Sequence, residues 1–173
     1  MKRIVLIVSA ALICTLASTV TAQKFALIDM EYILKSIPAY EMTNEQLAQL
    51  SEKWQAEVET LQQEAQAMYK NFQSDLVFLS AEMKSKREEE IVKKDQEAME
   101  LRRKYFSAEG ELYKKREQLM KPIQDEIYEA LKAISDEQGY MLIIDRASAM
   151  SVYFASPKID ISNEVLKKMG YSK

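Results

Sequence analysis

Three aspartates, Asp29, Asp145 and Asp160, stand at the ends of short apolar segments and are the side chains best placed to serve a reaction. Carboxylates that converge can act as a general acid and a general base. Nucleophilic catalysis and zinc binding usually require His or Cys, whereas this chain has no His and one Cys, Cys14. With three glycines in all, the sequence also has no glycine-rich phosphate loop. We therefore expect the aspartates to cap backbone N–H groups, and the sequence predicts neither an enzyme nor a metal or cofactor site.

The run of residues 41–138 is the element around which the rest of the chain must be arranged. It contains one glycine, Gly110, and one proline, Pro122, and it is filled with strong helix formers. Apolar residues recur every three or four positions through its first half, which is the pattern of one stripe along a helix. This stripe consists of Leu47, Leu50, Trp54, Val58, Leu61, Ala65, Met68, Phe72, Leu76 and Leu79.

The stripe ends just before Ser80, which can cap a new helix whose first turn carries Glu82. We therefore interpret the run as an antiparallel helical hairpin that turns near Ser80. Such a hairpin would set Trp54 against Tyr105 or Phe106, so that apolar residues meet across the seam. A continuous rod in a parallel coiled coil is the alternative, because a single serine is a weak break.

The apolar residues beside the turn have no apolar partner inside this hairpin, because the facing residues 84–90 are mostly charged. A long arm that ends in unpartnered hydrophobic side chains predicts a binding surface at its tip. Packing of the tip on a neighbouring chain is the alternative. The candidate binding residues are Met68, Phe72, Leu76, Val77, Phe78, Leu79 and Met83.

Strand-like apolar segments lie at both ends of the chain, at residues 24–30, 140–145 and 150–155. Residues near 27 and 143 must therefore pair to close a small β-body from which the arm projects. The fold class predicted is α+β, with a small β-body and a long antiparallel α-helical hairpin. The candidate core residues of the body are Phe25, Leu27, Ile28, Ile143, Ile144, Val152, Tyr153 and Phe154.

The predicted division of the mature chain is a β-rich association body, 23–40 and 120–173, and a hairpin arm, 41–119. We expect the arm to bend at Gly110 and Pro122, because proline interrupts helical hydrogen bonding and glycine lowers helix stability. The candidate core residues are few for an independent monomer, which favours association between subunits.

Residues 1–22 have the features of a cleaved secretory signal peptide: a basic head, a short apolar stretch and a small-residue cleavage site at Ala22. This segment contains Cys14, so the mature chain would have no cysteine and no disulfide. The whole chain carries a net charge of −3, which argues against a nucleic-acid partner. Beyond this segment the sequence has no apolar stretch long enough to span a membrane, so stable membrane insertion is not predicted.

The sequence resembles the Skp (OmpH) family of periplasmic chaperones over essentially all of the mature chain. The resemblance is carried by the signal peptide, the long charged hairpin and a set of short segments in the two chain ends. These segments are Leu27-Ile28-Asp29-Met30, Gly139-Tyr140, Leu142-Ile143-Ile144-Asp145, Val152-Tyr153, Ile159-Asp160-Ile161-Ser162 and Val165-Leu166.

Membership in this family would imply a homotrimer whose three chains build one small β-barrel body. Three helical arms would surround a cavity that holds unfolded outer-membrane β-barrel proteins in the periplasm, without ATP or metal. The best-known members are strongly basic, whereas this chain is acidic. We therefore expect hydrophobic contacts to dominate client binding, with an affinity that changes little with salt. A structural or adaptor coiled-coil protein of the cell envelope, with one defined partner, is the alternative function.

Overall fold

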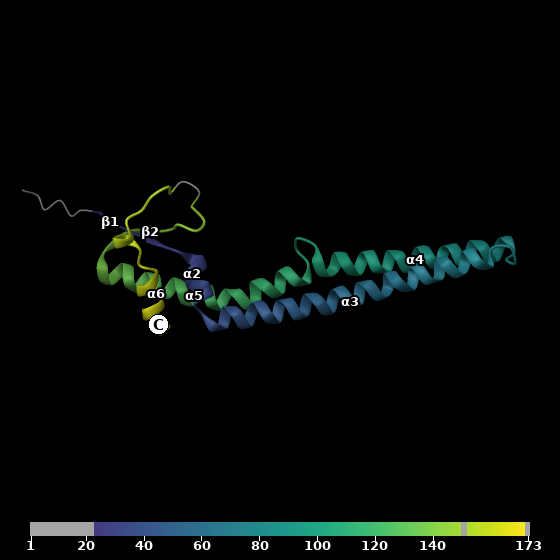
Figure 1. Cartoon of the computed structure of the whole chain (residues 1–173), viewed down its shortest axis with the longest axis horizontal. Coiled ribbons are helices and arrows are strands. Elements are labelled where there is room, and N and C mark those ends of the chain that lie inside the picture. Colours follow the sequence, from purple (N-terminus) through teal and green to yellow (C-terminus); the bar gives the residue numbers. More distant parts are fainter. Residues whose placement is uncertain (1–22, 150–151, 172–173) are drawn as a thin grey trace, which may run out of the picture.

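The computed structural model describes residues 23–149 and 152–171 and shows a small body from which a long helical hairpin projects (Figure 1). The predicted signal peptide lies outside the described residues. The elements in chain order are β1 (Lys24–Ile28), α2 (Met30–Lys35), α3 (Pro38–Asp75), α4 (Ala81–Phe106), α5 (Glu111–Gln138), β2 (Tyr140–Asp145), the 3-10 turn η1 (Pro157–Ile159) and α6 (Ser162–Lys168).

The antiparallel hairpin is confirmed, and the continuous rod is excluded. Helix α3 begins with Pro38 in its first turn, and its 38 residues make it about 57 Å long at 1.5 Å per residue. The chain reverses before Ser80, whose hydroxyl accepts a hydrogen bond from the Met83 N–H at the start of α4. Across the seam, the rings of Trp54 and Tyr105 stack with centroids 4.5 Å apart.

The return arm is divided into two helices beside Gly110, one of the two residues at which the sequence predicted a bend. Helix α4 ends at Phe106, and α5 begins after Gly110, which occupies its N-cap position. An added Cβ at Gly110 would lie 2.7 Å from the Tyr105 carbonyl oxygen and 2.9 Å from the Ser107 nitrogen. The backbone therefore folds so tightly on itself here that a side chain has no room.

The two chain ends pair as the sequence predicted, because β1 lies parallel to β2. Ala26 is opposite Ile143, and Leu27 is opposite Ile144. On its other side β1 forms one parallel bridge, from Leu27 to Asp160. The strand predicted at 150–155 is wrong for residues 152–155, and residues 150–151 lie outside the described part of the chain. A strand requires a neighbour for its backbone hydrogen bonds, and within the described residues of one chain this segment has none.

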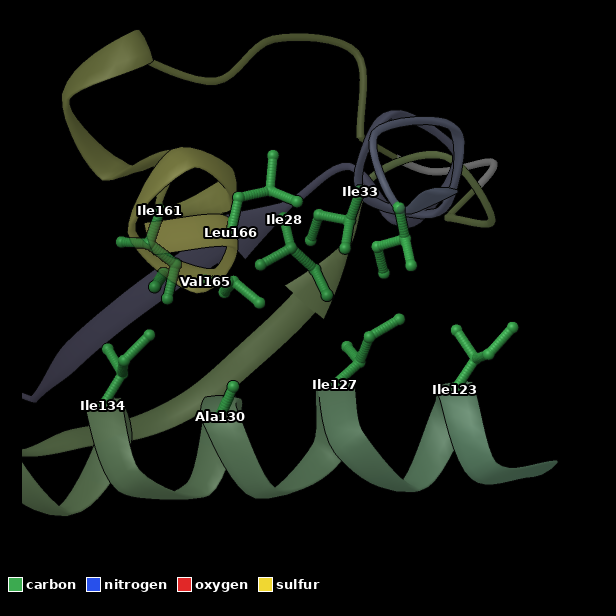
Figure 2. Packing of buried hydrophobic residues seen from close by; sticks show 11 residues of the cluster. Ile28, Ile33, Ile123, Ile127, Ala130, Ile134, Ile161, Val165 and Leu166 are labelled. Atoms are coloured by element: carbon green, nitrogen blue, oxygen red, sulfur yellow. The ribbon is translucent and has the colours of Figure 1, made fainter. Parts of the chain in front are cut away.

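The body core lies between α5 and a cover formed by β1, α2 and α6 (Figure 2). One stripe of α5 points into it, and Figure 2 shows this stripe facing the apolar residues of the other elements. Pro122 lies inside α5, immediately before the first core residue of the stripe. The buried core residues are Ala26, Ile28, Ile33, Ile37, Ile123, Ile127, Ala130, Ile134, Ile161, Val165 and Leu166.

Replacing Gly110 with Ala should lower the free energy of unfolding by about 1–3 kcal/mol, because the added methyl group meets backbone atoms that cannot move aside. Ser107→Ala changes an exposed position of the same turn and should shift that free energy by less than about 0.5 kcal/mol. Urea denaturation followed by circular dichroism measures both. Equal stability of Gly110→Ala and the wild type would show that the close approach is not rigid.

Candidate functional site

The tip of the hairpin exposes apolar side chains at the point farthest from the body (Figure 1). Helix α3 ends at Asp75, whose carbonyl oxygen accepts a hydrogen bond of 2.8 Å from the Phe78 N–H. This turn directs Val77 and Phe78 outward, with 88% and 85% of their side-chain surface exposed. Met83, in the first turn of α4, is also exposed. Together these residues form an apolar tip surface without cover in the single chain.

The other four candidate binding residues lie closer to the seam. Phe72 is buried at 6% exposure, so the expectation that it has no partner inside the hairpin is wrong. It continues the buried positions Val58 and Ala65 at a seven-residue spacing, which keeps it in the seam. Met68, Leu76 and Leu79 are half-buried. The tip surface therefore consists of Val77, Phe78 and Met83, with Leu76 and Leu79 at its base.

The predicted body core divides in the same way into buried and exposed members. Leu27 and Ile28 are buried, and Ile143, Ile144 and Val152 are half-buried. Three others, which were assigned to the core of the associated body, are exposed in the single chain. These residues are Phe25, Tyr153 and Phe154.

The three aspartates converge at the carboxyl ends of the paired strands, where they hold the body together. Asp29 Oδ2 lies 3.0 Å from the Arg146 guanidinium, which also lies 3.5 Å from Asp160 Oδ2. Asp160 Oδ1 accepts a hydrogen bond of 2.6 Å from the Ser162 hydroxyl, and that hydroxyl in turn accepts one from the Asp29 N–H. Asp145 Oδ1 accepts from the N–H of Met30 at the start of α2.

Each carboxylate in this cluster is occupied by donors, as the prediction of capping requires. A hydrogen bond from the Tyr32 N–H is the largest influence on Asp29 and lowers the pKa of its carboxyl, and Arg146 lowers it further. Burial raises the pKa of Asp145, but hydrogen bonds from Ser148 and from backbone N–H groups outweigh it, and the net direction is down. Both groups are therefore held as charged acceptors, which suits helix caps and not a general acid.

Sequence reasoning missed Arg146, which joins two of the aspartates. The signal was its position directly after Asp145, at the end of a strand that had to pair with the strand before Asp29. Within residues 23–149 and 152–171 no group of three or more His, Cys, Asp or Glu side chains is arranged so that it could hold a metal ion. No helix in this described part is long and apolar enough to cross a membrane.

Comparison with known proteins identifies the family. Residues 24–169 match the family model described as outer membrane protein (OmpH-like). The chain belongs to the OmpH-like family. Its α+β architecture also matches the crystal structure of an OmpH-like protein from Caulobacter crescentus CB15, with a TM-score of 0.68 over 86% of this chain and 85% of that one. At 11% sequence identity, this match shows a shared OmpH-like fold.

Two curated OmpH-like relatives carry the name chaperone protein Skp. The protein from Yersinia enterocolitica is 25% identical over 174 residues, which cover 98% of this chain and 99% of the relative. The protein from Pectobacterium atrosepticum is 26% identical over 162 residues, which cover 88% of this chain and 89% of the relative. The resemblance drawn from the short motifs at the chain ends is thus confirmed at the level of the family.

The aspartate cluster makes a prediction about acid stability. Because folding lowers the pKa of Asp29 below the ordinary value of 3.8, its charge stabilises the folded state at neutral pH, and this contribution is lost as the pH falls through that region. Asp29→Asn should therefore cost about 1 kcal/mol at pH 7, and the gap to the wild type should narrow as the pH falls below 3.8.

Urea denaturation at a series of pH values measures this gap. Asp136→Asn, on an exposed face of α5, is the matched control and should stay within about 0.5 kcal/mol of the wild type at pH 7. A gap for Asp29→Asn that stays constant from pH 7 to 3 would show that shape, and not charge, carries the role of Asp29.

Proposed function

We propose that this chain is an ATP-independent holdase chaperone of the periplasm that keeps unfolded outer-membrane β-barrel proteins soluble. The observation that carries the proposal is the apolar tip surface at the end of a long arm, in a chain of the OmpH-like family. Unfolded β-barrel proteins expose apolar side chains in many sequence contexts. A surface of Val77, Phe78 and Met83 binds such chains through burial of apolar area, which does not demand one defined sequence.

Self-association into a homotrimer is part of the proposal. A two-stranded sheet is marginal by itself, and the body exposes large apolar residues around it. Subunit contacts would cover this surface and give residues 152–155 the strand neighbours that one chain does not supply. The exposed residues that would be covered are Phe25, Met141, Leu142, Tyr153 and Phe154.

Delivery to the periplasm would depend on residues 1–22 as a cleaved signal peptide, in agreement with the family model, whose match begins at residue 24. The proposed activity is non-covalent binding of an unfolded client, with no enzymatic step. It requires neither a cofactor nor a nucleic acid, and the apolar surfaces would serve subunit and client contacts without stable insertion into a membrane.

Native mass spectrometry of the mature protein tests the proposal. Alone, the protein should appear as a trimer. After dilution of a denatured outer-membrane β-barrel into it, the trimer should gain the mass of one client. A trimer that ignores the client while the client precipitates would favour the adaptor function instead. A monomer or dimer would overturn the proposed assembly.

The tip surface makes a second prediction. Replacing both Val77 and Phe78 with Ser should weaken client binding at least about tenfold, because burying one such side chain stabilises a complex by about 1.5–3 kcal/mol. The thermal unfolding temperature should not change, since both side chains are exposed in the folded chain. Fluorescence titration with a denatured β-barrel measures the affinity.

Met42→Ser is the control, because Met42 is an exposed apolar residue of α3 that lies far from the tip. It should bind the client as the wild type does. Unchanged binding by the double tip variant would remove the tip from the proposed mechanism, although holding by other surfaces would stand.

A further inference from the structure

The two flanks of the hairpin differ in chemistry. On one flank, charged groups of the two helices neutralise one another. Lys94 of α4 lies 3.2 Å from Glu64 of α3 and 3.2 Å from Glu97. Farther along the same flank, the Tyr105 hydroxyl donates a hydrogen bond of 2.7 Å to Glu57. The charged and polar groups named on this flank therefore bond to one another: one lysine pairs with two glutamates, and a tyrosine hydroxyl bonds to a third glutamate.

The opposite flank is a groove with a volume of about 500 Å³. Residues four and seven positions apart line it on each helix, which places them on one face of α3 and one face of α4. Its floor is apolar, and the side chains of Tyr69, Val92 and Met99 are more than half exposed along its walls. We call it the glutamine groove, and its lining residues are Gln62, Ala65, Gln66, Tyr69, Ile91, Val92, Asp95, Gln96 and Met99.

Three of the lining side chains are amides, Gln62, Gln66 and Gln96, and one, Asp95, is charged. Such a low share of charge stands out in a chain in which 29% of residues are charged. Each amide offers two donors and one carbonyl acceptor, which is the same pairing capacity that a peptide group seeks. The groove thus combines apolar walls with neutral groups able to satisfy an exposed polypeptide backbone.

We propose that the glutamine groove binds an extended, uncharged segment of an unfolded polypeptide, with its apolar side chains against Val92 and Met99 and its peptide groups bonded to the glutamine amides. The inference rests on the proposed function and names the part of a client that this flank recognises. Methionine adapts its shape to different neighbours, which suits clients of varied sequence.

An extended segment fits the groove better than a helix from a second copy of this chain. A helix satisfies its own peptide groups, so the glutamine amides would have no backbone group to bond. The helices of this chain would also bring many charges into a groove whose lining has one charged residue, Asp95. The groove continues into a second depression that is lined by Gln96, Met99 and two residues of opposite charge, Glu100 and Arg103. From Val92 to Arg103 the helix rises about 16 Å, the length of about five residues of extended chain.

The test compares two double variants with the same change of charge. In the full mature protein, Gln66→Glu with Gln96→Glu places two carboxylates in the groove. Gln49→Glu with Gln124→Glu places two on exposed sites outside it. Gln66 and Gln49 are matched in helix context, because Lys70 follows Gln66 and Lys53 follows Gln49 at four residues, a spacing at which acid and base attract.

The probe is a blocked nine-residue peptide that alternates Val and Tyr with Ser and Thr, has no charged residue and carries a neutral fluorophore. Fluorescence anisotropy measures its affinity. The groove variant should bind it about tenfold more weakly, because a carboxylate that loses water against an uncharged peptide is costly. The control variant should stay within about twofold of the wild type. Equal binding by the two variants, or no binding to the wild type, would overturn the inference.

Holding of a denatured outer-membrane β-barrel, measured in parallel by light scattering, separates the two proposals. If the wild type prevents precipitation but the groove variant binds the peptide normally, the groove inference fails and the chaperone function stands. If the peptide affinities change as expected while the wild type does not hold the barrel, the groove stands and the proposed function fails.

Discussion

The parallel pairing of β1 with β2 is the constraint on which the rest of the structure depends. Parallel strands cannot be joined by a tight turn, because the chain must return to the end at which it started. In most proteins one crossover helix makes this return, whereas here the whole hairpin does so. Both ends of the arm are therefore fixed in the body, where Asp29 caps α2 after β1 and Gly139 ends α5 before β2.

The hairpin itself follows from how little surface two helices can cover. Each helix buries one stripe against the other, so the seam holds Val58, Ala65, Phe72 and Ala98 and leaves two flanks and a tip in solvent. On one flank the charged groups pair. The other flank and the tip carry uncharged amides and apolar side chains. The same geometry that limits the core of the arm thus creates the surfaces proposed here for unfolded chains.

Local signals in the sequence predicted the hairpin well, whereas features that depend on contacts between distant segments were predicted less well. The cap at Ser80 and the stop at Gly139 act within one turn of the chain, so they were visible in the residues. The strand predicted at 152–155 was wrong because its residue types favour a strand, but no described segment of the chain lies beside it to share backbone hydrogen bonds. A bend was predicted at Gly110, but the complete break between two helices was not, because the close approach of the Tyr105 carbonyl exists only in three dimensions. Phe72 was placed in the tip because the facing residues 84–90 are mostly charged. The seven-residue spacing from Val58 and Ala65, which keeps Phe72 in the seam, was given too little weight.

The apolar surfaces of this chain lie far apart, which explains how the chain can expose them without forming one aggregation-prone patch. The tip surface and the exposed residues of the body lie at opposite ends of the molecule (Figure 1), so they do not merge into one large patch of the kind that drives aggregation. Between these two surfaces the arm carries many hydrated charged residues. Because the chain has a net charge of −3, electrostatic repulsion disfavours the close approach of two arms. An unfolded client has no such separation, since its apolar residues are distributed along a flexible chain. In the proposed function, the arm would select flexible partners: a flexible chain could reach the tip and the groove together, whereas a second rigid arm would have to bring its charges with it.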